Sequence, residues 1–188
     1  MIKRKLFIIF LFLNLSFTTG NLFEFKLPNL ENKIISFSDF KSNNATIIVF
    51  LLSDCPASQS YSLTLNKLAK KYNKNNVSMI GVFPGTFSTD DELRKFRSMN
   101  KINFQLVKDP EMKLAKHLHA NIGPSCFLID EFGNVVYKGR IDDWLFSIGK
   151  KRQVITENNL DDAIKCVITK KPIKITETKA IGCILEYD

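Results

Sequence analysis

Cys55 is the residue of this chain best placed for covalent chemistry. The unbroken apolar run from Ile47 to Leu52 comes shortly before it and predicts a buried strand, because the run is short and rich in β-branched and aromatic residues. Apolar residues at helical spacing follow, from Tyr61 to Tyr72. Cys55 therefore lies between a buried strand and a helix, and Pro56 falls in the first helical turn, where its missing N–H costs nothing.

The start of a helix favours the reactive form of a thiol. A thiol is a poor nucleophile until it ionises, and the unpaired N–H groups and partial positive charge of a helix N-terminus stabilise the thiolate. The strand–Cys–Pro–helix order thus predicts that Cys55 is a nucleophile. The competing interpretation is a structural cysteine packed under a helix, since cysteine is among the most frequently buried residue types.

The rest of the chain predicts the elements that must position this cysteine. Two short alternating segments, 23–27 and 33–37, flank a turn and predict a hairpin ahead of the central strand. Hydrophobic patterns predict further strands and helices after the helix that follows Cys55. The expected strands are 77–83, 104–107, 126–130 and 135–139, and the expected helices are 90–99, 110–118 and 159–168. This order predicts an α/β protein with a mixed sheet and helices on both of its faces.

Three features together resemble the thioredoxin fold. They are the Cys-Pro turn after the central strand, a proline before a strand about 70 residues later (Pro124), and a Phe-Gly-Asn hairpin at 132–134. The chain is most similar to the redoxin or AhpC/TSA (peroxiredoxin-like) version of that fold. The segments FLLSDCPASQSYSLTLNKL, 137–152 and TKAIGC resemble exported bacterial redoxin-domain proteins, and the resemblance extends over about residues 23 to 185. It implies a thioredoxin-like three-layer α/β/α fold with a mixed central sheet, an N-terminal hairpin and a C-terminal extension.

The resemblance also implies a substrate groove beside Cys55. Pro124 matches the proline that is cis in this fold and packs against the active cysteine, and its two neighbours would offer backbone groups to a partner thiol or peptide. The alternative for Pro124 is an ordinary proline at the start of a strand. The candidate groove residues are Pro56, Ser58, Gly123, Pro124, Ser125 and Arg140. Arg140 would stabilise a thiolate or an anionic intermediate, or else form a surface ion pair with Asp142 or Asp143.

Two departures from the relatives bear on the substrate. The fourth residue of Cys-Pro-Ala-Ser is Ser58, which cannot close a disulfide within the tetrad. Peroxiredoxins carry a threonine three residues before their reactive cysteine, whereas this chain has Leu52 there. The expected function is therefore thiol chemistry on either a peroxide (antioxidant activity) or a disulfide partner, without a cofactor. The alternative is a non-catalytic binding module with a structural disulfide.

Three further cysteines leave the disulfide pairing open, since four cysteines allow three complete pairings. Cys126 and Cys166 have apolar neighbours and are expected in the core, with an approach of Cys126 to Cys55 as the alternative. Cys183 follows a Lys/Thr segment, 170–179, that is expected to be mobile. A cysteine on a flexible arm can reach an attacked sulfur, and Cys183 lies in a motif that the resemblance highlights. Cys183 is thus the candidate resolving cysteine, or a structural tether for the tail.

The N-terminus predicts export. Residues 1–20 combine Lys3, Arg4 and Lys5 with an apolar run of about a dozen residues, the layout of a secretory signal peptide. We therefore expect a periplasmic or extracellular protein with a redoxin domain at 21–150 and a C-terminal helix and tail at 151–188. Contact with a membrane is expected only through an uncleaved signal segment.

Charge and composition argue against other functions. Loss of the three basic leader residues lowers the formal charge from +8 to +5. The basic residues do not alternate with aromatic ones, so nucleic-acid binding is not expected. His117 and His119 have no third ligand at metal spacing, and no metal site is expected.

Overall fold

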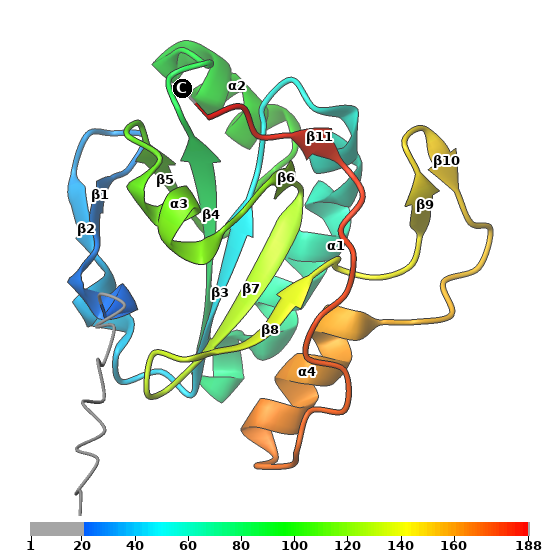
Figure 1. Cartoon of the computed structure of the whole chain (residues 1–188). Helices are drawn as coiled ribbons and strands as arrows, with labels where there is room; N and C mark the ends of the chain where they lie inside the picture. Colours follow the sequence, from blue (N-terminus) through cyan, green and yellow to red (C-terminus); the bar gives the residue numbers. More distant parts are fainter. Residues whose placement is uncertain (1–20, 188) are drawn as a thin grey trace, which may run out of the picture.

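The computed structural model describes residues 21–187, and its centre is a five-stranded sheet in the order β5-β4-β3-β7-β8 (Figure 1). β3 runs parallel to β4, and β4 runs parallel to β5, whereas β7 is antiparallel to both β3 and β8. The bounds are Ala45–Phe50 for β3, Val77–Pro84 for β4, Gln105–Asp109 for β5, Ser125–Asp130 for β7 and Val135–Gly139 for β8. The predicted mixed sheet is confirmed.

Within the described residues, four α-helices accompany the sheet: α1 (Pro56–Tyr72), α2 (Asp90–Met99), α3 (Lys113–Leu118) and α4 (Asn159–Ile168). Short 3-10 turns occupy Leu22–Glu24, Phe37–Phe40 and Asn73–Asn75. Thr89 caps the N-terminus of α2 in a capping box. Its side chain accepts the backbone N–H of Glu92, and the Glu92 side chain accepts the backbone N–H of Thr89. α3 begins three residues later than predicted. Pairing with β4 continues as far as Asp109, whose carboxylate then accepts the backbone N–H of Ala115.

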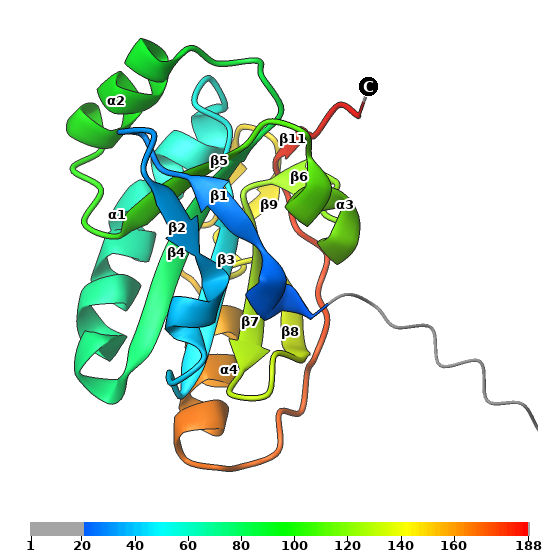
Figure 2. The ribbon, with the colours of Figure 1, turned by 90° about the vertical axis from the view of Figure 1, so that its left-hand side faces the viewer.

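The fully buried strand β3 divides the core into two layers. Ile47, Val49 and Leu51 lie in one cluster with apolar residues of α1, α2 and α4. Ile48 and Phe50 lie in the other cluster with α3 and the N-terminal hairpin. This alternation follows from the period of two along a strand. Helices thus cover both faces, as predicted, and Figure 2 shows the hairpin and α3 on the same side of the sheet.

The predicted N-terminal hairpin is present as β1 (Lys26–Pro28) and β2 (Ile34–Ser36), which pair in antiparallel register. Asn29 organises the turn between them. Its side-chain oxygen accepts the backbone N–H groups of Glu31 and Lys33 at 3.0 and 2.9 Å.

Four short strands were not predicted: β6 (Ile122–Gly123), β9 (Leu145–Ser147), β10 (Lys150–Lys151) and β11 (Cys183–Ile184). β9 and β10 form a hairpin after the sheet, and β11 pairs with β6. The missed strands are two or three residues long, too short to show a period in sequence.

The segment 170–179 is not a free arm, and that expectation was wrong. After α4 the chain returns along β8, where the backbone N–H of Lys138 donates to Thr176 O and that of Thr178 donates to Lys138 O, both at 3.0 Å. β8 is the last strand of its sheet, and its outer backbone groups remain available for such pairing. The predicted signal peptide, 1–20, lies outside the described residues. None of the helices described within 21–187 is long and apolar enough to cross a membrane.

Candidate functional site

Cys55 is the residue that caps the N-terminus of α1, directly after the loop that leaves β3. Its backbone is extended, Pro56 is the first helical residue, and the Cys55 carbonyl accepts the N–H of Gln59 at 3.1 Å. The side chain of Cys55 is only 2% exposed, while Pro56 is exposed. The predicted strand–Cys–Pro–helix junction is therefore present.

Ser58 holds this junction together from inside. Its hydroxyl accepts the backbone N–H of Leu52 at 3.1 Å, and its carbonyl accepts the hydroxyl of Ser62 at 3.0 Å. Ser58 is fully buried, so its side chain is not offered to a ligand in this form of the protein. Gln59, one residue on, donates its amide to Ser53 O at 3.0 Å and closes the loop from the outside.

The loop predicted to face Cys55 does so. The Gly123–Pro124 peptide bond is cis, and Cys55 Sγ lies 3.4 Å from Gly123 O. Ser125 begins β7 opposite Phe50 and is buried. Its hydroxyl is the one buried side-chain oxygen or nitrogen within residues 21–187 that has no hydrogen-bond partner.

Cys183 forms a disulfide with Cys55 across a sequence separation of 128 residues, with the two Cα atoms 6.1 Å apart. The neighbouring strands make this approach possible, because β11 pairs antiparallel with β6 and sets Cys183 opposite Gly123. Figure 1 shows β11 passing beside β6 at the end of the sheet where α1 begins. The structure thus brings together both cysteines and the cis-proline loop.

Residues that the sequence did not single out dock the tail at this point. Gly182 is buried against Gly123, and a Cβ there would lie 2.2 Å from the Gly123 oxygen. The backbone N–H of Leu185 donates to Asn121 O at 2.9 Å, and its side chain is buried in the core layer that contains α3. The hydroxyl of Tyr187 donates to the carbonyl of Ala120. A glycine directly before Cys183 was the only sequence signal of this close approach.

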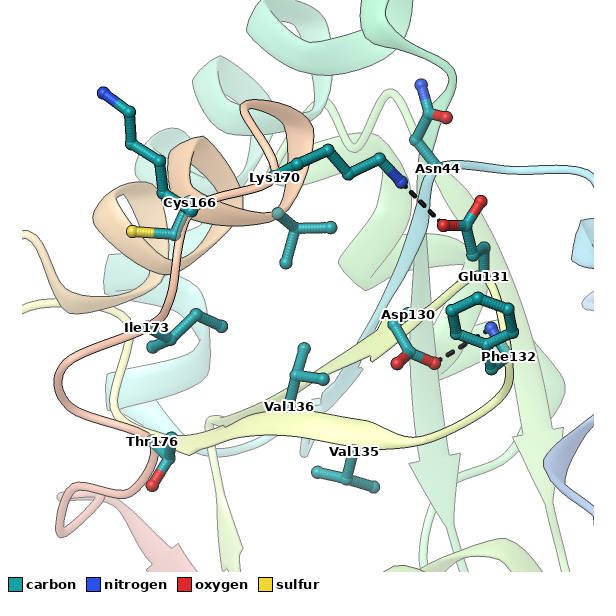
Figure 3. Close-up of a pocket in the computed structure, with 12 residues that line it drawn as sticks. Asn44, Asp130, Glu131, Phe132, Val135, Val136, Cys166, Lys170, Ile173 and Thr176 are labelled. Atoms are coloured by element: carbon teal, nitrogen blue, oxygen red, sulfur yellow. Dashed lines mark hydrogen bonds and ion pairs between the residues drawn. The ribbon is translucent and has the colours of Figure 1, made fainter.

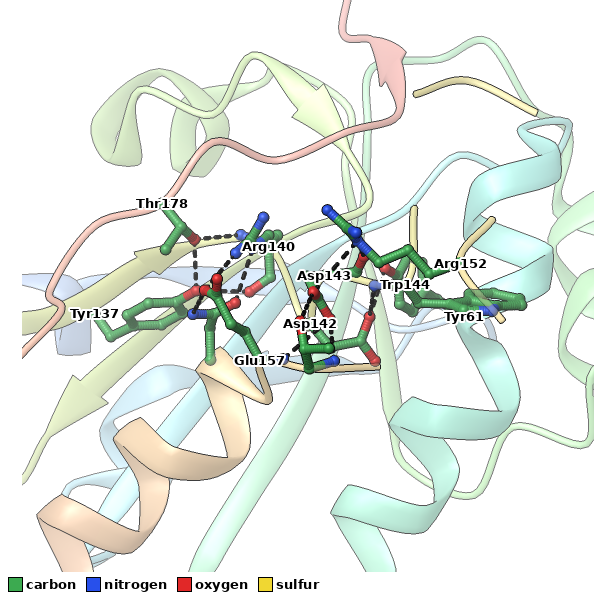
Figure 4. Close-up of polar contacts among 11 residues, drawn as sticks. Tyr61, Tyr137, Arg140, Asp142, Asp143, Trp144, Arg152, Glu157 and Thr178 are labelled. Atoms are coloured by element: carbon green, nitrogen blue, oxygen red, sulfur yellow. Dashed lines mark hydrogen bonds and ion pairs between the residues drawn. The ribbon is translucent and has the colours of Figure 1, made fainter. Parts of the chain in front are cut away.

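A second contact fixes the tail before it reaches Cys55 (Figure 4). Thr178 shares a hydrogen bond of 2.7 Å with the Tyr137 hydroxyl and accepts the backbone N–H of Arg140 at 3.0 Å. Gly139 has a φ of +133°, and a side chain there would collide with Thr178. The Arg140 guanidinium points to the start of α4, where it contacts Glu157 at 2.7 Å and Asn159 at 2.8 Å. Its ion-pair partner is therefore Glu157, and the expected ion pair with Asp142 or Asp143 was wrong.

Two buried carboxylates follow Arg140. Asp142 accepts the Tyr61 hydroxyl at 2.7 Å, and burial raises the pKa of both groups. Asp143 accepts the Thr156 hydroxyl and the backbone N–H groups of Thr156 and Glu157, which lower the pKa of Asp143 to about 2. These contacts tie the loop after β8 to α1 and to the segment before α4 (Figure 4). Tyr61 therefore belongs to the core, where it supports the helix that carries Cys55.

A cavity of about 200 Å³ adjoins the loop between β3 and Cys55. Its wall combines apolar residues, among them Leu51, Leu52 and Phe83, with polar residues such as Ser88 and Asp90. A larger cavity, of about 600 Å³, lies at the other end of β3 (Figure 3). Its lining residues include Asn44, Val136, Cys166 and Ile173, and the Lys170–Glu131 ion pair closes one side at 2.6 Å.

The two remaining cysteines are free thiols. Cys126 is fully buried in β7, its thiol donates to Gly139 O at 3.3 Å, and burial raises its pKa. Cys166 is partly exposed on α4. The described part of the chain contains no cluster of three or more His, Cys, Asp or Glu side chains that could hold a metal ion.

Comparison with known proteins agrees with this architecture. The AhpC/TSA family matches residues 20–138. A glutathione peroxidase-like peroxiredoxin of Candida albicans is 23% identical over 149 residues, which cover 76% of this chain and 86% of that protein.

Solved structures show the same fold. A hypothetical protein from Sinorhizobium meliloti superposes with a TM-score of 0.79 at 24% identity, covering 87% of this chain and 91% of that one. A secreted disulfide oxidoreductase of Mycobacterium tuberculosis, homologous to Escherichia coli DsbE, gives a TM-score of 0.56 at 12% identity and covers 79% of this chain and 96% of that one. The family match extends over more than half of the chain, and the fold agrees with it. The chain therefore belongs to the AhpC/TSA family of thioredoxin-like redoxins, whose members are typically thiol peroxidases or disulfide oxidoreductases.

Proposed function

We propose that this protein is a thiol–disulfide oxidoreductase in which Cys55 is the nucleophile and Cys183 is the resolving cysteine. The observation that carries the proposal is the Cys55–Cys183 disulfide, which lies at the N-terminus of α1 and against the Gly123 carbonyl. Once reduced, Cys55 meets the unpaired N–H groups of the first helical turn, which stabilise its thiolate.

The reaction proceeds by two exchanges. The Cys55 thiolate attacks one sulfur of a partner disulfide, forms a mixed disulfide and releases the other partner sulfur as a thiolate. Cys183, as a thiolate, then attacks the Cys55 sulfur, and the first partner sulfur leaves. Two electrons pass from the protein's dithiol to the partner, and an external dithiol reductant restores Cys55 and Cys183.

The surroundings of Cys55 favour a disulfide over a peroxide as substrate. Leu52 occupies the place of the threonine that peroxiredoxins carry three residues before their reactive cysteine. The tail strand supports the same choice, because it places an extended chain and a cysteine sulfur directly against Cys55.

A thiol peroxidase is the second candidate, favoured by the similarity to the Candida albicans peroxiredoxin. In that reaction the Cys55 thiolate attacks a peroxide oxygen and becomes a sulfenic acid, while the alcohol or water leaves. Cys183 then displaces the hydroxyl group as water and forms the same disulfide.

Single-turnover kinetics of the reduced protein tests the proposal. Equal concentrations of oxidised glutathione and of hydrogen peroxide are supplied separately, and formation of the Cys55–Cys183 disulfide is followed after acid quenching. We expect faster formation with the disulfide and none in Cys55→Ser. A faster reaction with peroxide would favour the second candidate, and no reaction with either would favour a binding module with a structural disulfide.

We also propose that the protein acts outside the cytoplasm. The signal-like segment 1–20 supports this proposal, because a basic start followed by a short apolar run is typical of a secretory signal peptide. Fractionation of the producing cells, with N-terminal sequencing of the mature chain, tests it. Full-length protein in the cytoplasm would contradict it.

A further inference from the structure

We propose that the site recognises a protein partner as an extended strand, in the place now filled by residues 182–185, and selects for a small residue just before the partner's cysteine and an aliphatic residue two positions after it. This inference rests on the proposed function and adds the class of substrate. Its basis is that the protein's own tail is already a ligand of the site, with its sulfur bonded to Cys55.

The backbone of β6 is what an incoming strand would pair with. β11 lies antiparallel to it, Cys183 is opposite Gly123, and Ile184 is opposite Ile122. One further hydrogen bond, from the Leu185 N–H to Asn121 O at 2.9 Å, extends the pairing. These main-chain contacts do not depend on the side chains of the guest, so any extended segment can make them.

The position before the cysteine admits only a small residue. A Cβ on Gly182 would lie 2.2 Å from the oxygen, 2.7 Å from the carbonyl carbon of Gly123 and 2.9 Å from the nitrogen of Pro124. All three are backbone atoms of the loop that faces Cys55, so they cannot swing away as a side chain would. A partner with a bulky residue here cannot come as close to β6 as the tail does.

The position two residues after the cysteine admits a large apolar side chain. Leu185 is 3% exposed, and its side chain reaches within 3.6 Å of the position of a Cβ on Gly123. The intervening Ile184 is 75% exposed, so burial does not restrict the side chain at this position. The alternation follows from the strand geometry and defines a small–Cys–any–aliphatic pattern.

The tail and the partner compete for the same position beside β6. This competition links the last chemical step to release of the partner. The partner in the mixed disulfide takes the place of residues 182–185. When the Cys183 thiolate attacks Cys55 and the partner's thiolate leaves, β11 pairs with β6 again. Once the partner's sulfur has left, the tail that returns to β6 replaces the partner's main-chain contacts.

The test uses the full-length protein with the substitutions Cys183→Ser and Cys166→Ser. It measures the rate constant with which Cys55 of this protein forms a mixed disulfide with short synthetic peptides. The peptides span residues 179–187, with the cysteine activated by Ellman's reagent, so that each capture releases a coloured thiolate. Parent peptide is compared with peptides carrying Gly182→Val, Leu185→Asp or Ile184→Asp. The tail of the protein competes equally with all four, so the ratios of their rate constants report recognition alone.

We expect the Gly182→Val and Leu185→Asp peptides to react at least about tenfold more slowly than the parent, and the Ile184→Asp peptide to stay within about twofold. The four peptides are also compared in a single turnover of the reduced natural protein. The ratios of their rate constants should be the same there, which shows that they do not depend on the two substitutions. Equal rates for all four peptides, with rapid capture of Ellman's reagent itself, would overturn the inference and leave the proposed function intact. A Cys55 that does not react even with Ellman's reagent would overturn both.

Discussion

Gly182→Ala is the substitution that probes the docked tail most directly. The new methyl carbon would lie 2.2 Å from the Gly123 oxygen, a distance that real side chains essentially never show. Gly182 does not need a left-handed backbone, since its φ is outside the positive range that the structure records at Gly85, Gly133, Gly139 and Gly149. The effect of the substitution is therefore steric, and the tail must move away from β6.

The size of the effect follows from what the tail loses. Removing Leu185 from the core costs about 2 kcal/mol, within the usual range for burying a leucine. Loss of the Leu185–Asn121 hydrogen bond costs about a further 1 kcal/mol. Together they correspond to a fall of about 100-fold in the effective concentration of Cys183 at Cys55.

The equilibrium between the reduced protein and the Cys55–Cys183 disulfide in glutathione buffers reports this quantity. We expect the Gly182→Ala equilibrium constant for disulfide formation to fall by about 100-fold. Ile184→Ala is the matched control, because it lies in the same strand with a side chain that is 75% exposed. It should change the constant by less than about threefold. A Gly182→Ala constant within about threefold of the natural protein would show that the tail is not docked on β6.

Three more predictions follow from the same contacts. Because the disulfide closes a loop of 128 residues, its reduction should lower the free energy of unfolding by about 5 kcal/mol, and equal urea midpoints for oxidised and reduced protein would contradict this. Iodoacetamide should label Cys166 in the native protein and leave Cys126 unmodified, since Cys126 is fully buried and burial raises its pKa; labelling of Cys126 first would refute the assignment. The pKa of Asp143 is lowered to about 2, so its charged form stabilises the fold above about pH 4, and this contribution is lost as the pH falls toward 2. Asp143→Asn should therefore lose less stability than the natural protein between pH 5 and 3 in urea titrations, and parallel curves would exclude the effect.

The sequence was sufficient to predict the strands and helices whose apolar residues follow a clear pattern. β3 is buried on both faces and reads as an apolar run, while α1 carries a regular apolar stripe, so the position of Cys55 between them could be predicted. The bounds of α4 also agree with those expected from its apolar spacing. α3 began later than expected because Asp109 completes β5, a pairing that depends on β4.

The tail could not be predicted in the same way. Its contacts are with distant backbone atoms of Gly123, Asn121 and Lys138, and main-chain pairing leaves little trace in residue type. The Lys- and Thr-rich composition of 170–179 therefore suggested mobility, although the edge of β8 supplies its partners. The role of Ser58 inside the junction was hidden for a similar reason, since its hydrogen bond is to the backbone of Leu52.

Peptide mapping after rapid trapping tests whether Cys55 pairs with Cys183 during turnover. The fully reduced protein receives one equivalent of oxidised glutathione, is quenched in acid, alkylated and digested. We expect a linked peptide pair containing Cys55 and Cys183, with Cys126 and Cys166 recovered in alkylated form. Recovery of Cys55 as an alkylated thiol, or its linkage to Cys126 or Cys166, would contradict it.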